Sequence, residues 1–233
     1  MTRINDNLTR MQQLHAPWYV GPYFILTMTL LLCAIAYPIG AQFFGSGLLR
    51  IAITALLLAS VYAVVNRIWL FRILLVLVVP VVLINWVIDP VEDHKFLDWL
   101  TVLSTDAFLF AVLITVFIDV IRSKRVTADT IFGAVAVYLL FGVVMAMMFQ
   151  FVNSVDPGSV IASVGEATNI VERYDQFAEF MYFSFITLTS VGYGDLTPIG
   201  PAARSLAMFE GVIGQLYLAI LIARLVGIHV AQD

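Results

Sequence analysis

The stretch Thr187-Leu188-Thr189-Ser190-Val191-Gly192-Tyr193-Gly194-Asp195 decides the fold of this chain. It lies between two long apolar runs and carries glycine at two alternating positions, 192 and 194. Glycine adopts left-handed φ values at little cost, so successive backbone carbonyls can turn toward one side. A backbone of this kind can present a row of carbonyl oxygens, which can take the place of the water around a cation.

The composition predicts an integral membrane protein surrounded by a lipid bilayer. The 233 residues are 61% hydrophobic and 12% charged, with a mean hydropathy of +0.97. Soluble domains are about 45–50% apolar and about 25% charged. The net charge is −4, and no basic run predicts nucleic-acid binding.

The chemistry-bearing residues argue against catalysis. Cys33 is the only cysteine, so an intrachain disulfide is impossible and a zinc site built on thiolates is disfavoured. The sequence shows no nucleophile–base pair, phosphate loop or metal-ligand cluster. We therefore expect a non-enzyme without a cofactor.

Six apolar runs have about the 20 residues that a helix needs to cross a bilayer. They cover residues 18–40, 48–66, 69–89, 97–121, 128–152 and 199–228. Backbone polar groups must be paired internally in lipid, which predicts helices. A seventh run, 177–189, is too short to span and predicts a re-entrant pore helix. The expected fold class is an all-α membrane protein with six transmembrane helices, a pore helix and a filter.

Basic residues predict the orientation, because they concentrate on the cytoplasmic side. A cytoplasmic N-terminus places Arg3, Arg10, Arg67, Arg72, Arg122, Lys124, Arg125 and Arg224 inside and leaves Arg50, Lys95, Arg173 and Arg204 outside. Six spans then return the C-terminus to the cytoplasm. The filter follows the fifth span and enters from outside.

The string T-x-S-V-G-Y-G-D resembles the signature of the potassium channel family, in its form with six spans and one pore loop. Ser190 stands where the family more often has threonine. The resemblance covers about 126–233. Four pore loops build such a filter, so one loop per chain implies a homotetramer with three further copies.

The resemblance implies roles for the filter and its surroundings. Potassium would be bound by the carbonyls of Ser190, Val191, Gly192 and Tyr193, with Gly194 completing the filter and the Ser190 hydroxyl completing the innermost site. Filter support would come from Thr189, Asp195, Tyr182 and Phe183. Ile186 stands where some relatives carry a carboxylate that pairs with the filter aspartate, so that pair cannot form here.

The last span carries the residues expected to gate and line the cavity. Gly214 falls at the family's hinge position, and close helix packing is the alternative. Gln215, Leu218 and Ile222 share one helical face and are expected to line the cavity. Glu210 is ionisable at membrane depth. It either attracts cations into the cavity or locks the helix against the pore helix.

The expected domains are a cytoplasmic N-terminal segment (1–16), a four-helix domain (17–125) and a pore domain (126–233). The four-helix layout resembles voltage-gated channels, but the span 97–121 contains no arginine or lysine. Steep voltage gating needs about 3–4 charges per subunit. We therefore expect opening to be voltage-independent or weakly dependent. Asp106 in this span is either an ion-pair partner of Arg50 or a proton sensor.

The expected function is passive, selective conduction of potassium across the plasma membrane, without a cytosolic ligand domain. Three alternatives remain open. Ser190 is compatible with a weakly selective cation channel. The chain could also be the membrane subunit of a potassium uptake system with a soluble regulator, or a non-conducting scaffold.

Overall fold

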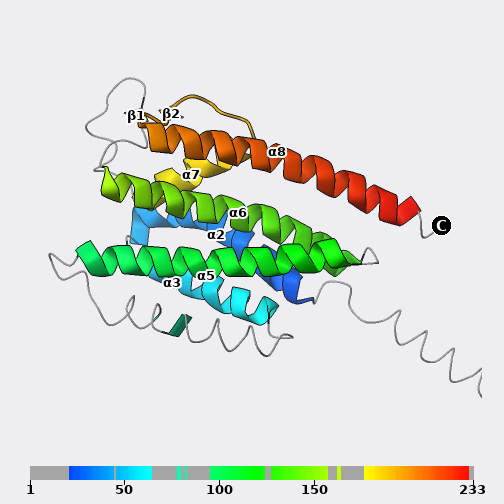
Figure 1. Cartoon of the computed structure of the whole chain (residues 1–233). Helices are drawn as coiled ribbons and strands as arrows, with labels where there is room; N and C mark the ends of the chain where they lie inside the picture. Colours follow the sequence, from blue (N-terminus) through cyan, green and yellow to red (C-terminus); the bar gives the residue numbers. More distant parts are fainter. Residues whose placement is uncertain are drawn as a thin grey trace, which may run out of the picture.

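The computed structural model of the chain describes residues 21–44, 46–64, 78–79, 82, 95–123, 127–156, 162–163 and 176–230. These residues form helices and one short two-stranded sheet (Figure 1). The elements are α2 (Pro22–Phe44), α3 (Ser46–Ala63), α5 (Lys95–Arg122), α6 (Ala128–Val155), β1 (Ala162–Ser163), α7 (Gln176–Leu188), β2 (Leu196–Thr197) and α8 (Pro201–Val230). The all-helical prediction is confirmed for these parts of the chain. The N-terminal segment 1–16 and nearly all of the predicted span 69–89 lie outside the described residues.

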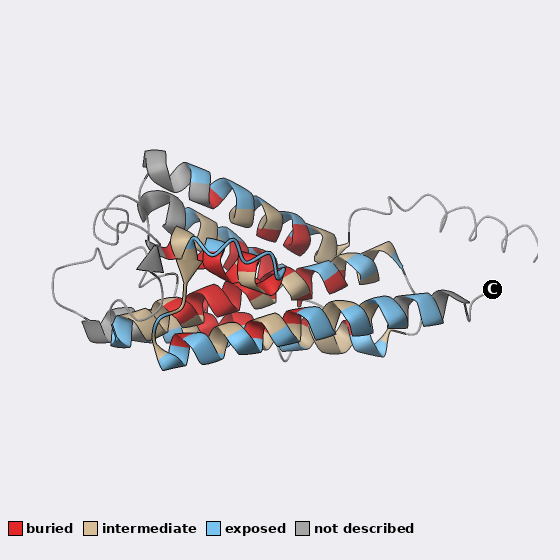
Figure 2. Cartoon of the chain, turned by 90° about the horizontal axis from the view of Figure 1, so that it is seen from above, coloured by how far each residue is buried: buried red, intermediate tan, exposed pale blue. Residues whose placement is uncertain are grey.

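Helix α6 is the centre of the packing. It contacts α2 and α5 on one side and α7 and α8 on the other, while α3 packs against α2 and α5. Figure 2 shows the buried residues gathered along these inner contacts. Large apolar side chains fill this core, among them Phe108, Phe149 and Phe180. Because lipid is as apolar as these side chains, close van der Waals packing between them is what favours helix association in a membrane.

Three helical stretches of the described part are long and apolar enough to cross a membrane. They are Val102–Arg122, Ala128–Val155 and Pro201–Arg224. Shorter apolar stretches cover Pro22–Tyr37, Ile51–Ala63 and Phe177–Leu188. The last of these covers the run for which the sequence predicts the pore helix; we keep that name for it, and its role stays a prediction. The prediction of six spans is therefore supported for three helices and stays a prediction as a count.

The helix α6 begins at a polar cap that also organises its neighbour. The Thr127 side chain accepts a hydrogen bond from the Thr130 N–H, which satisfies one free donor of the first turn. In the same turn, the Asp129 carboxylate accepts from the Tyr23 N–H in the first turn of α2. A carboxylate at a helix N-terminus also interacts favourably with the helix dipole. One acidic side chain thus fixes the ends of two helices to each other.

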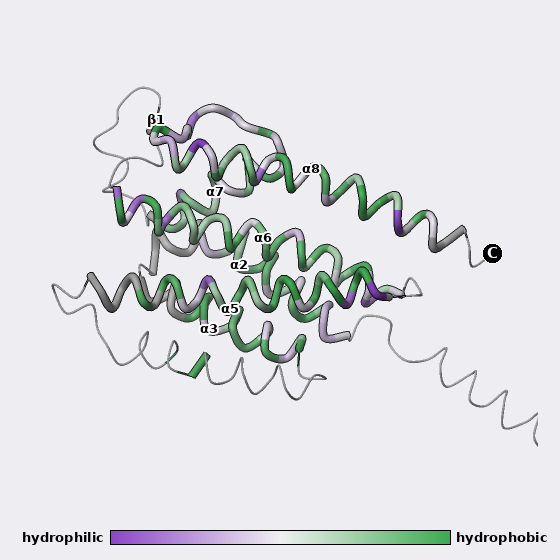
Figure 3. Tube along the Cα trace, viewed as in Figure 1, coloured by the Kyte–Doolittle hydropathy of each residue, from purple (hydrophilic) through white to green (hydrophobic). Residues whose placement is uncertain are grey.

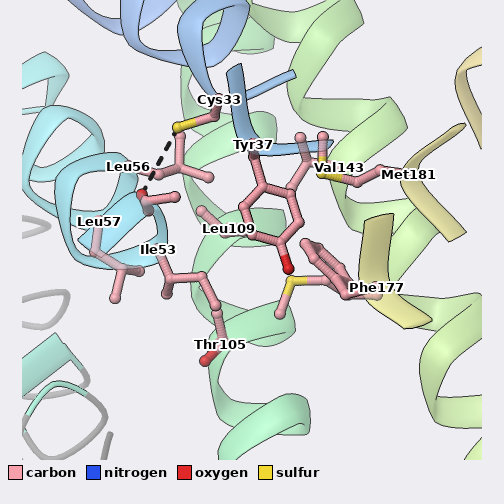
Figure 4. Close-up of a pocket in the computed structure, with 12 residues that line it drawn as sticks. Cys33, Tyr37, Ile53, Leu56, Leu57, Thr105, Leu109, Val143, Phe177 and Met181 are labelled. Carbon is pink, nitrogen blue, oxygen red and sulfur yellow. Dashed lines mark hydrogen bonds between the residues drawn. The ribbon is translucent and has the colours of Figure 1, made fainter. Parts of the chain in front are cut away.

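The helices that precede α6 are called the front helices here: α2, α3 and α5. Of these, α2 and α5 pack against the α6 of the same chain, and α2 also packs against α7. Only residues 123–127 separate α5 from α6, so the two helices form an antiparallel pair. On the opposite face, α2 contacts both α6 and α7. Figure 4 shows Tyr37 of α2 and Phe177 of α7 among the side chains that line one pocket. The volume of this cavity is about 20 Å³. The centroids of the two rings are 5.8 Å apart. The pore helix is therefore in direct contact with the front of the molecule.

The segments before the pore helix and after the filter are joined by the small sheet. Strands β1 and β2 are antiparallel, with Ala162 opposite Thr197 and Ser163 opposite Leu196. This pairing holds the outer end of the filter segment beside the loop that precedes α7.

Candidate functional site

The pore helix α7 ends between two helices that approach it through glycine. A Cβ built on Gly214 of α8 would lie 2.7 Å from the Leu188 carbonyl oxygen, and one on Gly142 of α6 would lie 3.1 Å from the Leu188 and Phe185 side chains. Tyr138 of α6 donates a hydrogen bond to the same Leu188 carbonyl, at 3.1 Å. The C-terminus of α7, where the filter begins, is thus held from both sides.

The backbone of the predicted filter, residues 190–194, adopts left-handed φ at every second residue. The φ values are +58° at Ser190, +50° at Gly192 and +80° at Gly194. The glycines fulfil the conformational role that the sequence predicts. Ser190 adopts the same region although it has a Cβ, at a cost of roughly 1–2 kcal/mol. It is the one non-glycine residue with positive φ in the described part of the chain.

Hydrogen bonds tie the inner half of the filter to the pore helix. The N–H groups of Val191 and Gly192 both donate to the Ile186 carbonyl, at 3.0 and 3.2 Å. In a trans peptide, the C=O points opposite to the N–H of the next residue. The carbonyls of Ser190 and Val191 therefore point away from α7. Within the described residues, no hydrogen bond uses the carbonyls of positions 190–193. They remain available to a cation.

The C-terminal end of the predicted filter is held by Tyr182. Its hydroxyl donates to Asp195 Oδ2 at 2.7 Å, and this bond raises the pKa of the Tyr182 phenol to about 12. The phenol therefore stays protonated and able to donate at neutral pH. Position 186 holds isoleucine and offers Asp195 no carboxylate partner. Asp195 is hydrogen-bonded to the Tyr182 hydroxyl instead. Phe183 faces the other way, in edge contact with Phe149 of α6 at 4.9 Å.

A second carboxyl group lies near the filter aspartate. Burial raises the pKa of Glu179 in the first turn of α7, and the charge of Asp195 raises it further. Sequence reasoning did not select Glu179 or anticipate the Tyr182–Asp195 bond. The three-residue spacing of Glu179 and Tyr182, one helical turn, is the signal that places both on one face.

The inner helix α8 faces the filter at Gln215. Its side-chain Nε2 donates to Ser190 Oγ at 2.9 Å. Leu218 and Ile222 share this helical face, but their side chains are apolar and cannot hydrogen-bond to Ser190. Ile222 is exposed in the single chain. Helix α8 runs unbroken through Gly214. The close approach of Gly214 to Leu188 agrees with close helix packing, the alternative to a hinge at this position. A hinge at Gly214 stays a prediction.

Glu210 is completely buried and does not face the expected cavity. One of its carboxyl oxygens is hydrogen-bonded with the Ser184 hydroxyl of α7, and Ser184 Oγ also lies 2.7 Å from the Gly142 carbonyl of α6. Of the two alternatives for Glu210, this geometry favours the one that locks α8 against the pore helix. Sequence reasoning missed Ser184, although it is a polar residue inside an apolar stretch of α7.

Asp106 is 3% exposed, and neither carboxyl oxygen has a hydrogen-bond partner in the described part of the chain. The side chain of Arg50, its expected partner, lies outside the described side chains. Both alternatives for Asp106 therefore stay open.

A known family matches the part of the chain that holds this site. Residues 133–230 match a family model described as an ion channel. Protein LctB of Bacillus caldotenax is 32% identical over 106 residues, which cover 45% of this chain and 75% of that protein. The chain belongs to the ion channel family. This channel is accordingly not an enzyme, and its long apolar helices are those of a membrane protein.

Other relatives of the channel carry potassium in their names. Potassium channel K1 of Plasmodium berghei (strain Anka) is 31% identical over 97 residues, which are 40% of this chain but 5% of that protein. The inward rectifier potassium channel Kirbac3.1 of Paramagnetospirillum magnetotacticum is 42% identical over 48 residues, or 21% of this chain and 16% of that protein. No solved structure matches the chain.

Proposed function

We propose that the protein is a potassium-selective channel that conducts passively and depends weakly or not at all on voltage. The observation that carries this proposal is the filter backbone. Left-handed φ alternates along positions 190–194, and the N–H groups of Val191 and Gly192 are bound to α7. Carbonyls on the opposite side are left free to coordinate a dehydrated cation. The names of two relatives support potassium as that cation.

We infer a homotetramer from surfaces that the single chain leaves uncovered. Tyr193 is 73% exposed. Helix α8 is apolar along most of its length (Figure 3), yet it is mainly exposed. Its large exposed side chains include Met208, Phe209, Val212, Leu216, Ile220, Ile222 and Val226. Three further copies around one axis would cover the filter and this face, and lipid would cover the rest.

The remaining assignments belong to the same proposal. The channel would lie in the plasma membrane with both termini cytoplasmic. Residues 17–125 would form the four-helix domain and residues 126–233 the pore domain. Potassium would be the permeant ligand, with no cofactor.

Potassium and sodium flux into proteoliposomes tests the proposal, with the two ions compared at equal gradients. Gly192→Val places a β-branched residue at φ +50°, where it is strongly disfavoured. Gly227→Val is the matched control, because an added Cβ at this helical glycine meets no atom. We expect potassium flux well above sodium flux in the parent and in Gly227→Val, and none in Gly192→Val.

Other outcomes favour the alternatives. Equal fluxes of the two ions would indicate a weakly selective cation channel, with Ser190 as its cause. Flux that appears only with added cytosolic extract would indicate an uptake subunit with a soluble regulator. Gly192→Val with the flux of the parent would refute the filter as the conduction path.

A further inference from the structure

We propose that Gln215 is a positioning residue that fixes the innermost ion site by holding the Ser190 hydroxyl, and that it thereby contributes to ion selectivity. The inference rests on the proposed function, since it concerns the same filter. It assigns to a single side chain of α8 a task beyond lining the cavity.

The direction of the hydrogen bond is the first argument. An amide nitrogen can only donate, so Ser190 Oγ accepts from Gln215 Nε2 at 2.9 Å. A hydroxyl oxygen has two lone pairs and one hydrogen. Gln215 occupies one lone pair and leaves the second for a cation. The bond therefore orients the hydroxyl without removing its capacity to coordinate an ion.

The residue type at position 190 is the second argument. Threonine is stiff about χ1 because its Cβ is branched, whereas serine rotates more freely. Ser190 also has a left-handed backbone at φ +58°, a conformation that persists only when its surroundings enforce it. Its own N–H is held by the Thr187 carbonyl at 3.0 Å. Gln215 supplies the restraint on the side chain, which a threonine methyl group would otherwise supply.

The position of Gln215 is the third argument. It follows Gly214, which approaches the Leu188 carbonyl too closely to allow a Cβ. This contact fixes the height and rotation of α8 beside the end of the pore helix. The next side chain along α8 is thereby presented to the first residues of the filter.

The test compares Gln215→Met, which keeps the length of the side chain and removes the donor, with Gln150→Met. Gln150 lies on α6 and makes no hydrogen bond to the filter within the described residues. Each substitution is made in the parent and in Ser190→Ala, which removes the hydroxyl without adding a branched side chain at φ +58°. Gln215→Asn, which is too short to reach Ser190, is a second variant if Gln215→Met does not fold.

Two readouts are used. The first is the potassium-to-sodium permeability ratio from reversal potentials of the reconstituted channel. The second is the apparent Kd for K⁺ from thermal stabilisation of the purified protein by KCl against NaCl, which does not require conduction.

We expect Gln215→Met to lower the permeability ratio and to weaken K⁺ binding by about threefold to tenfold, as loss of one hydrogen bond would. In Ser190→Ala the same substitution should have less than half of this effect on either readout, because no hydroxyl remains for Gln215 to hold. Gln150→Met should match its parent in both backgrounds.

Two results would overturn the inference while the proposed function stands. One is an unchanged ratio and Kd in Gln215→Met beside a potassium-selective parent. The other is an equal effect in both backgrounds, which would show that Gln215 does not act through Ser190. A parent that neither prefers potassium nor is stabilised by it would instead refute the proposed function, and the inference with it.

Discussion

The Ser184 hydroxyl lies within hydrogen-bond distance of two oxygens, the Gly142 carbonyl and a carboxyl oxygen of Glu210. A hydroxyl has one hydrogen, so it can donate to one of them only. If it donates to the Gly142 carbonyl, the contact with Glu210 needs a hydrogen from the carboxyl group. The second carboxyl oxygen is buried with no hydrogen-bond partner in the described part of the chain, which disfavours a charged Glu210. We therefore expect Glu210 to join α8 to α7 as a neutral acid.

We expect the free energy of unfolding of Glu210→Gln to lie within about 0.5 kcal/mol of that of the parent. The amide group of glutamine can donate a hydrogen bond to Ser184 as the acid does. Glu210→Ala should cost about 2–4 kcal/mol, since it leaves a cavity and removes the hydrogen bond. Thermal or denaturant unfolding of the purified protein measures both. A Glu210→Gln variant as unstable as Glu210→Ala would mean that the negative charge is required.

Side-chain partners were the least predictable features at this scale. The filter glycines could be read from the sequence because positive φ at alternating positions has few other solutions than glycine. The partner of Asp195 could not, because it depends on the rotation of α7, which places Tyr182 rather than Ile186 beside it. The contact of Gln215 with Ser190 likewise depends on the register of α8 against the filter.

Among the elements, α7 is held where α6 and α8 meet it at Leu188. The two glycines at this contact differ in what an added methyl group would strike. At Gly142 the nearest atoms are side-chain carbons at 3.1 Å, which can move. At Gly214 they include a backbone carbonyl oxygen at 2.7 Å, which is fixed by the end of the pore helix. Position 214 should therefore tolerate less than position 142.

We expect three alanine substitutions to rank in stability as Gly227→Ala, then Gly142→Ala, then Gly214→Ala. Alanine gains about 1 kcal/mol over glycine inside a helix, and Gly227 offers this gain without a new contact. Overpacking costs about 1–3 kcal/mol, which should make Gly214→Ala a net loss. Melting temperatures in one detergent give the ranking. A Gly214→Ala variant as stable as Gly227→Ala would exclude the packing role and leave the hinge.

Most helices could be placed from hydropathy alone, because lipid enforces helical backbone wherever a long run is apolar. The predicted run 128–152 corresponds to α6 (Ala128–Val155), and 177–189 to α7 (Gln176–Leu188). The ends were less accurate, since α5 starts at Lys95 and continues to Arg122. The residues at the ends of α5 are polar or amphipathic, so hydropathy does not show at which residue the helix begins or ends.

For the whole molecule, the short connection between α5 and α6 restricts the arrangement of a tetramer. The connection of residues 123–127 is too short for α5 to pack along the α6 of another copy instead of the α6 that follows it in the chain. The side chain of Arg224 adds a second tie, because it donates to the Ser123 carbonyl at 3.1 Å and so joins α8 to the end of α5. We expect the front helices of each copy to pack on the pore helices of the same chain.

Cysteines at positions 120 and 133 test this arrangement. An added Cβ at Gly133 would lie 3.1 Å from Val120 Cγ2, a separation that suits a disulfide between α5 and α6. In a Cys33→Ser background, oxidised Val120→Cys with Gly133→Cys should migrate as a single chain on a non-reducing denaturing gel. The two single-cysteine variants are the controls. Covalent dimers or larger species in the double variant alone would indicate exchange of helices between copies.

The packing of α2 and α5 along α6 limits how far this channel can be treated as an interchangeable set of modules. Where α6 meets these helices, Gly133 leaves the space that Tyr23 of α2 and Val120 of α5 occupy. A chimera that joins this pore to the front helices of another channel would meet that face with the wrong shape. Transplanting the pore with function therefore calls for transferring the complementary residues of α2 and α5 with it.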